Sequence, residues 1–173
     1  MKKFALLLYL ILITCSVQAQ EGKNQIGIAA EAGIPMGNFG DRFKTSVGGS
    51  LKGLYGIGKN GQVTFTTGFM RFKSDGAISR TSIIPFLGGY RHNLANGIYL
   101  EPQLGYGIYK LRHELPFGFE EPRYGAFTYA IGVGFAAGGF DAGVRHQAAG
   151  GRAKGTSAIV VRLGYNFTLG GSK

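Results

Sequence analysis

The sequence predicts an all-β fold, an eight-stranded antiparallel up-and-down transmembrane β-barrel, on the basis of three observations. After residue 20, apolar side chains recur at every second position, which is the period of a β-strand. The segments with this period are joined by connections that are alternately long and short. Charged residues make up 16% of the chain, against about 25% in typical soluble proteins. An alternating chain with so few charges is typical of strands that cross a membrane.

The last segment shows the alternation most clearly. Within residues 158–169, one set of alternate side chains is apolar and the other set is mostly small or polar. Seven earlier segments repeat the pattern, each with about the 9–11 residues that a tilted strand needs to cross a bilayer. They are residues 24–34, 46–57, 62–72, 82–91, 98–109, 124–136 and 139–147. Pro85 and Pro102 fall inside two of these segments and predict β-bulges, because proline cannot donate to a hydrogen-bond ladder.

The connections between the segments fall into two length classes, which alternate along the chain. The long ones are residues 35–45, 73–81, 110–123 and 148–157, and the short ones are residues 58–61, 92–97 and 137–138. All the short connections contain glycine, which supplies the positive φ that tight hairpins need. Outer-membrane barrels have short periplasmic turns and longer outer loops. The pattern therefore predicts a barrel in the outer membrane of a Gram-negative bacterium, with both chain termini in the periplasm.

The first residues have the features of a secretory signal peptide. A positively charged start, an apolar run over residues 4–13 and a small-residue pattern that ends at Ala19 follow one another. The run is too short for a membrane helix, which needs about 20 residues. We therefore expect a signal peptide over residues 1–19, cleavage without a lipid on Cys15, and one barrel domain over residues 20–173.

The polar face of the strands carries charged side chains. Eight strands leave a lumen just wide enough for side chains, so these groups are predicted to meet inside the barrel. Isolated buried charges are strongly unfavourable, and we therefore expect acids and bases to pair there. The predicted lumen network consists of Glu31, Lys52, Arg91, Glu101, Asp141, Arg145 and Arg162.

The segment from Arg162 to Leu169 combines a polar residue, a glycine, an aromatic residue and a hydrophobic residue in a fixed order. It is similar to the C-terminal signal that the barrel-assembly machinery recognises. With its strands, the chain resembles the small outer-membrane barrels of the OmpA/OmpX type and, more closely, the broad outer membrane protein beta-barrel domain family. The resemblance implies the assembly machinery as a partner during biogenesis, and a signal formed by Arg162, Gly164, Tyr165, Phe167 and Leu169. The tail after Leu169 departs from the family, many of whose members end at or next to the aromatic residue.

No residue pattern predicts catalysis, a cofactor or a metal site. None of the histidines has metal-binding spacing with another. Barrels that deacylate lipid A are known for a histidine and a serine two residues apart, whereas His146 is followed by Gln147 and Ala148. Without that serine, the histidine has no hydroxyl nucleophile to activate.

The basic residues are dispersed over the long connections, and an exported barrel does not meet nucleic acid, so we expect no nucleic-acid partner. Two interpretations of these residues are open. They form either a positive rim toward the phosphates of lipopolysaccharide or ordinary solvated loops.

These patterns favour a monomeric, non-enzymatic barrel, surrounded by outer-membrane lipid, with a structural or interaction role in the cell envelope and no open pore. The alternative is a secreted soluble barrel that binds an apolar ligand, as lipocalins do, and the third hypothesis is a lipid A-modifying enzyme. A lipocalin-like barrel needs an apolar interior and a charged exterior. The face opposite the apolar one is instead rich in Gly, Ala, Ser and Thr, which favours the membrane barrel.

Overall fold

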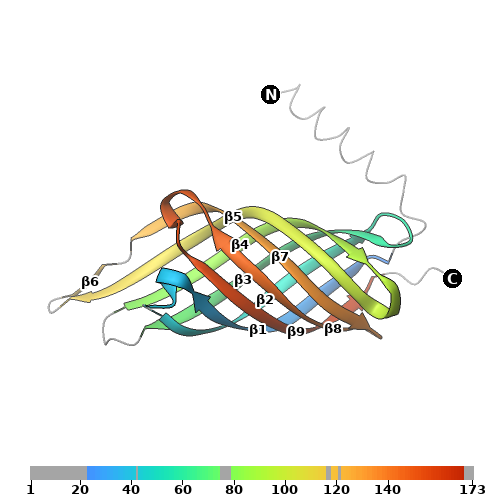
Figure 1. Ribbon diagram of the computed structural model, residues 1–173, viewed down its shortest axis with the longest axis horizontal. Helices are drawn as coiled ribbons and strands as arrows, with labels where there is room; N and C mark the ends of the chain where they lie inside the picture. Colours follow the sequence, from blue (N-terminus) through green and yellow to red (C-terminus); the bar gives the residue numbers. More distant parts are fainter. Residues whose placement is uncertain (1–22, 42, 75–78, 116–117, 121, 170–173) are drawn as a thin grey trace, which may run out of the picture.

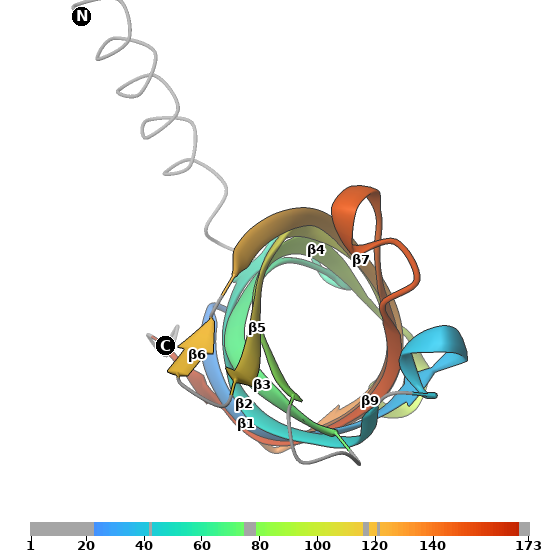
Figure 2. The same ribbon diagram turned by 90° about the vertical axis from the view of Figure 1, so that its left-hand side faces the viewer.

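The computed structural model describes residues 23–41, 43–74, 79–115, 118–120 and 122–169. Within these ranges, only the backbone is described for residues 74, 79–80, 112–115, 118–120 and 152. In this part of the chain, nine strands form one antiparallel sheet that closes into a barrel (Figures 1 and 2). They are β1 (Gln25–Met36), β2 (Phe43–Gly56), β3 (Gly61–Ser74), β4 (Ser79–Asn93), β5 (Ile98–Leu115), β6 (Gly118–Glu120), β7 (Arg123–Ala137), β8 (Phe140–Ala149) and β9 (Ser157–Thr168). The predicted signal peptide, residues 1–19, lies outside the described residues.

Eight of the strands form the wall of the barrel. Each pairs with the wall strands before and after it in the sequence, and β1 pairs with β9 to close the ring. The short strand β6 pairs with the end of β5 and extends that hairpin beyond the wall (Figure 1). The predicted eight-stranded up-and-down barrel is therefore confirmed.

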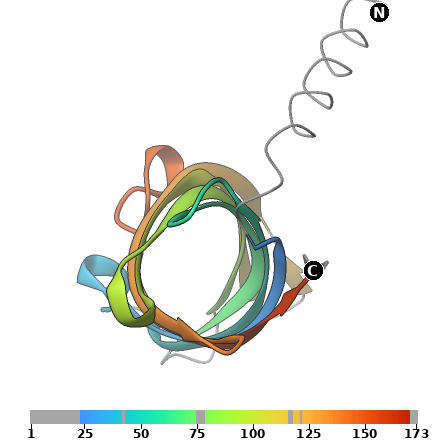
Figure 3. The same ribbon diagram turned by 90° about the vertical axis from the view of Figure 1, so that its right-hand side faces the viewer.

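The connections lie at two ends of the barrel (Figures 2 and 3). The short-turn end holds residues 57–60, the 3-10 turn η2 (Ala95–Gly97) and residues 138–139. Gln25 pairs with Thr168 at the same end, so the chain enters and leaves the sheet there. The opposite, long-hairpin end holds the turns η1 (Gly37–Phe39) and η3 (Gly151–Ala153) and the strand β6.

The strands at the long-hairpin end are longer than the alternation predicts. Residues 73–81 and 110–123 were expected as long connections, but β4 begins at Ser79 and β5 runs to Leu115. Charged and polar side chains hide the apolar period in these segments. The backbone still gains from pairing, because every N–H and C=O group needs a partner. The hairpins therefore continue past the apolar part of each strand.

The two prolines do not produce the predicted bulges. The pairing of β3 with β4 lacks a partner assignment at Pro85, and the pairing of β4 with β5 lacks one at Pro102. The register is the same on both sides of each gap. Each proline thus removes local hydrogen bonding without adding a residue to the strand. The one register shift in the described pairings lies between Phe43 and Thr45, at the start of β2.

The outer surface of the barrel is apolar. Large hydrophobic side chains at outward positions, and in the adjoining turns, keep between 39% and 67% of their surface exposed. They come from every wall strand and include Val47, Leu104, Ile131 and Leu163. Soluble monomers rarely expose apolar patches larger than a few hundred Å². A band of this kind around a barrel instead matches the surface that faces lipid.

The interior of the barrel is filled by two layers of side chains. An apolar cluster lies toward the long-hairpin end and includes Phe43, Phe72, Ile83 and Tyr109. Charged and amide side chains fill the interior between this cluster and the short-turn end. Beyond them, a cavity of about 750 Å³, lined by Gln62, Asn93 and Asn166 among others, opens at the short-turn end. A polar interior inside an apolar exterior is the reverse of a lipocalin and does not favour that alternative.

Candidate functional site

The candidate site is the charged network in the middle of the barrel. Strand alternation aims its side chains inward from six of the eight wall strands, and the ring brings them together. All seven residues predicted for the lumen are buried, with no more than 6% of their surface exposed. They are Glu31 on β1, Lys52 on β2, Arg91 on β4, Glu101 on β5, Asp141 and Arg145 on β8, and Arg162 on β9.

Glu101 is the centre of one half of the network. Its carboxylate accepts hydrogen bonds from Lys52 Nζ at 2.7 and 2.8 Å, and from Arg91 Nε and Nη2 at 3.0 and 2.9 Å. Thr64 and Gln103 donate two further bonds to its Oε1 atom, at 3.0 and 2.9 Å. Charge-assisted hydrogen bonds of this length are the strongest class in proteins. Glu101 therefore joins β2, β3, β4 and β5 through one side chain.

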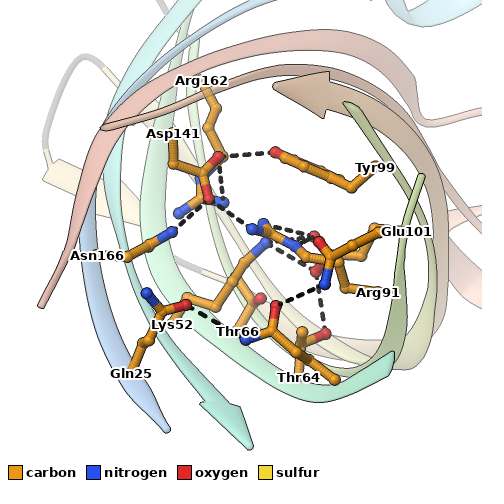
Figure 4. A network of polar contacts seen from close by, with 12 residues as sticks. Gln25, Lys52, Thr64, Thr66, Arg91, Tyr99, Glu101, Asp141, Arg162 and Asn166 are labelled. Atoms are coloured by element: carbon orange, nitrogen blue, oxygen red, sulfur yellow. Dashed lines mark hydrogen bonds and ion pairs between the residues drawn. The ribbon is translucent and has the colours of Figure 1, made fainter. Parts of the chain in front are cut away.

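Asp141 is the centre of the other half. Figure 4 shows its carboxylate between Arg91, Arg162, Tyr99 and Asn166. Tyr99 Oη donates at 2.7 Å, while Asn166 Nδ2 and Arg91 Nη1 donate at 2.8 Å. The bond from Arg162 Nη1 is longer, at 3.5 Å. Asp141 is fully buried, so these bonds replace the water that its charge would otherwise require.

Arg91 connects the two halves. It binds Glu101 through Nε and Nη2 and Asp141 through Nη1, and its guanidinium carbon lies 3.7 Å from the centre of the Tyr99 ring. The planar guanidinium suits both contacts, because it presents donors at its edge and a flat face to an aromatic ring. Two carboxylates and one ring thus fix the orientation of a single side chain.

Glu31 and Arg145 form a separate pair. Arg145 Nη2 donates to Glu31 Oε2 at 2.9 Å, and Ser50 Oγ donates to Glu31 Oε1 at 2.7 Å. In the strand register Glu31 lies opposite Arg162, not Arg145. The ion pair therefore connects β1 with β8 over the intervening strand β9, beyond the direct neighbours in the sheet.

The sequence predicted the charged residues of the network but not all of the uncharged side chains that form hydrogen bonds with them. Tyr99 was not singled out, although its position two residues before Glu101 places it on the inward face. An aromatic hydroxyl on the polar face of a strand is the signal that could have identified it. Asn166, Gln103, Ser50 and Thr64 lie on the polar faces of their strands, but the alternation by itself indicates no partners for them.

The segment predicted as an assembly signal belongs to β9. Arg162 points into the lumen, whereas Tyr165, Phe167 and Leu169 point outward and stay between 46% and 50% exposed. The rings of Tyr165 and Phe167 lie 4.9 Å apart. Gly164 is partly buried and lies on the same face of β9 as Arg162. The segment thus presents an aromatic outer surface next to the strand that closes the ring.

The network consists of buried charged side chains that bind one another. Among the described residues, no group of three His, Cys, Asp or Glu side chains is placed to hold a metal ion. His146 lies on β8 between Ile131 and Ile159 on the neighbouring strands, away from the lumen charges. No helix in the described part of the chain is long and apolar enough to span a membrane.

No protein-family model and no curated protein matches the chain. Solved structures do match it. Ail, the attachment invasion locus protein of Yersinia pestis, in complex with the heparin analogue sucrose octasulfate, is 19% identical with a TM-score of 0.64, over 86% of this chain and all of Ail. The N-terminal β-barrel domain of Pseudomonas aeruginosa OprF is 13% identical with a TM-score of 0.64, over 85% of this chain and all of that domain. Neisserial surface protein A is 15% identical with a TM-score of 0.57, over 86% of this chain and all of that protein. The chain therefore has the fold of the small eight-stranded outer-membrane barrels of the OmpA/OmpX type.

Proposed function

We propose that the protein is an outer-membrane barrel without an open pore, which has a structural or interaction role in the envelope of a Gram-negative bacterium. The filled interior carries this proposal. The cavity within the charged network measures only about 20 Å³, and the cavity within the apolar cluster only about 10 Å³. A single water molecule needs roughly 10–15 Å³ of such space, so no continuous water column crosses the described interior.

The apolar exterior supports a location in the outer membrane, with lipid as the immediate surroundings. The proposal places the short-turn end, and with it both termini, in the periplasm, because outer-membrane barrels keep their short turns there. The long hairpins then face the outside and are free to contact lipid or a partner. The proposed barrel is a monomer, which is compatible with a lumen that one chain completes without a second copy.

Electrical recording tests the absence of a pore. The purified barrel, reconstituted in a planar lipid bilayer, is expected to give no stepwise conductance above that of the protein-free bilayer, since both interior layers block ions. A known porin, reconstituted in parallel, shows that insertion succeeds under the same conditions. Stable conductance steps from the folded protein would contradict the proposal.

The proposal includes assembly by the barrel-assembly machinery through the outward aromatic surface of β9. Phe167→Asp is expected to lower the yield of folded, membrane-inserted barrel strongly, because it removes the aromatic slot and adds a charge to the lipid face. Phe167→Tyr keeps the ring and is expected to assemble normally. The heat-dependent shift of the folded barrel in gel electrophoresis of membrane fractions measures the yield. Equal yields from the two variants would exclude Phe167 from the signal.

A cationic rim at the long-hairpin end supports lipopolysaccharide as a contact of the proposed barrel. The described part of this end carries exposed or half-exposed basic side chains of Lys44, Lys73, Lys110, Arg123 and Lys154. Lys110 and Arg123 lie opposite each other on β5 and β7. Each cation near an anionic lipid surface contributes about 1 kcal/mol. Ail was solved with an anionic saccharide analogue, which shows that one barrel of this fold accepts such a ligand.

Paired substitutions test the rim. The double variant Lys73→Gln, Arg123→Gln is expected to weaken lipopolysaccharide binding about 30-fold, the equivalent of about 2 kcal/mol. Its control, Lys23→Gln with Lys59→Gln, removes two exposed bases at the short-turn end and is expected to bind normally. Retention of lipopolysaccharide by the detergent-solubilised barrel, measured by native mass spectrometry over a titration, compares the two. The same loss in both would show that net charge, not the rim, governs binding.

The proposal assigns no catalytic role to the chain. The missing serine after His146 removes the nucleophile that a lipid A deacylase of this shape would need. Mass spectra of lipid A from a strain with and without the gene are expected to be identical. A difference in acylation would instead support the enzymatic hypothesis.

A further inference from the structure

The charged network in the barrel interior has one more basic side chain than acidic side chains among its described members. Among the described side chains, four buried bases face three buried acids: Lys52, Arg91, Arg145 and Arg162 against Glu31, Glu101 and Asp141. One positive charge in the described interior therefore has no carboxylate of its own. An uncompensated charge at this depth is strongly unfavourable, so the imbalance calls for a counter-ion.

The unmatched charge localises to two arginines. Arg145 uses Nη2 for Glu31, while its Nε and Nη1 atoms are buried without a hydrogen-bond partner among the described residues. Arg162 uses Nη1 for the long contact with Asp141, and its Nε and Nη2 atoms are likewise buried without a partner. Every guanidinium nitrogen carries at least one donor hydrogen. Four buried nitrogens on two cations thus lack an acceptor.

The strand register brings the two arginines close together. Arg162 on β9 lies opposite Gly143 on β8, and Arg145 lies two residues farther along β8. Such diagonal neighbours on one face of a sheet have Cα atoms about 7–8 Å apart, within reach of long side chains. Gly132 on β7 lies on the other side of Arg145 in the register. Both arginines and both glycines line one small cavity of about 20 Å³.

The lining of this cavity selects an anion. Its described ionised side chains are those of Lys52, Arg145, Arg162 and Glu101, so three positive charges face one negative charge. A cavity of about 20 Å³ has room for one particle of roughly the size of a water molecule. A water molecule has two acceptor lone pairs and adds no charge, whereas a halide accepts several donors and supplies the missing negative charge. We propose that the barrel core holds one small monovalent anion, chloride in the cell, between Arg145 and Arg162.

Unfolding at constant ionic strength tests the site. In urea unfolding of the detergent-solubilised barrel, stepwise replacement of gluconate by chloride is expected to shift the midpoint upward and to saturate. At a chloride concentration about nine times its dissociation constant, the unfolding equilibrium constant falls about tenfold, as for any ligand of the folded state. Arg162→Gln balances the described interior charges and is expected to lose the chloride dependence. Lys59→Gln, which removes an exposed base in a turn, is expected to keep it.

Bromide provides a test that does not depend on the variant. Crystals of the unmodified protein grown in sodium bromide are expected to show an anomalous scattering peak between the two guanidinium groups. The proposal is overturned if ordinary water density without an anomalous peak occupies the cavity and chloride leaves the unfolding midpoint unchanged. If Arg162→Gln does not fold, the bromide peak and the chloride titration of the unmodified protein still decide between anion and water.

Discussion

Glu101→Gln is expected to destabilise the barrel by about 3–5 kcal/mol, the typical cost of removing one partner from a buried ion pair. The substitution keeps the size of the side chain and removes its charge, so the loss is electrostatic. Lys52 is 2% exposed, and Glu101 accepts both of its ion-pair bonds. Arg91 keeps Asp141 as a partner in the variant, whereas Lys52 keeps no charged partner among its described contacts. Urea unfolding in detergent micelles measures the difference in free energy of unfolding.

A second substitution tests whether the lost stability comes from the broken Lys52–Glu101 ion pair or from the change at position 101 alone. Lys52→Met combined with Glu101→Gln removes the stranded charge and is expected to recover a large part of the lost stability, because the cost of breaking a buried pair comes mainly from the charge left without a partner. The four proteins of this double-mutant cycle give the coupling energy of Lys52 with Glu101. Asp41→Asn, at an exposed site near η1, is the control and is expected to have almost no effect. Equal effects of Glu101→Gln and Asp41→Asn would mean that the lumen is wet enough to screen its charges.

Ile131→Arg is expected to destabilise the barrel in a lipid bilayer by about 2–4 kcal/mol, the cost of a cation on the lipid face near the bilayer midplane. Ile131 points outward from the middle of β7 and is 55% exposed. In water, an arginine at such a position would be nearly neutral, because its charge would stay solvated. Urea unfolding of the barrel from lipid vesicles measures the cost.

The control is a residue with a similar exposure at a different depth. Leu94 is 52% exposed and lies in the turn between β4 and β5, at the short-turn end. Near the membrane interface the cost of a cation falls to about 0–1 kcal/mol, so Leu94→Arg is expected to be nearly silent. In a soluble barrel, the two substitutions would change the free energy of unfolding by similar amounts. Equal stabilities of the two variants would therefore argue against a membrane location.

The sequence by itself determined the number of wall strands and the direction of their side chains. Alternation is a local property, because successive residues of a strand point to opposite faces whatever the strand packs against. For that reason the sequence alone predicts that Glu31, on the first strand, and Arg162, on the last, face the same side of the sheet, although 131 positions separate them in the sequence. Both side chains are buried in the structure. Local turn chemistry likewise indicated the short hairpins, where Asn96 and Gly97 adopt positive φ.

Only the tertiary structure decided which inward groups meet. Arg91 binds two acids and stacks on Tyr99, and Glu31 pairs with Arg145 instead of the opposite Arg162. These choices depend on the tilt of the strands and on the width of the closed ring, which no single strand encodes. The same holds for Pro85, whose missing donor is tolerated without a bulge because the barrel fixes the register around it. The alternation along each strand determines whether a side chain faces the lumen or the lipid. The contacts between inward side chains are set by the geometry of all eight wall strands together.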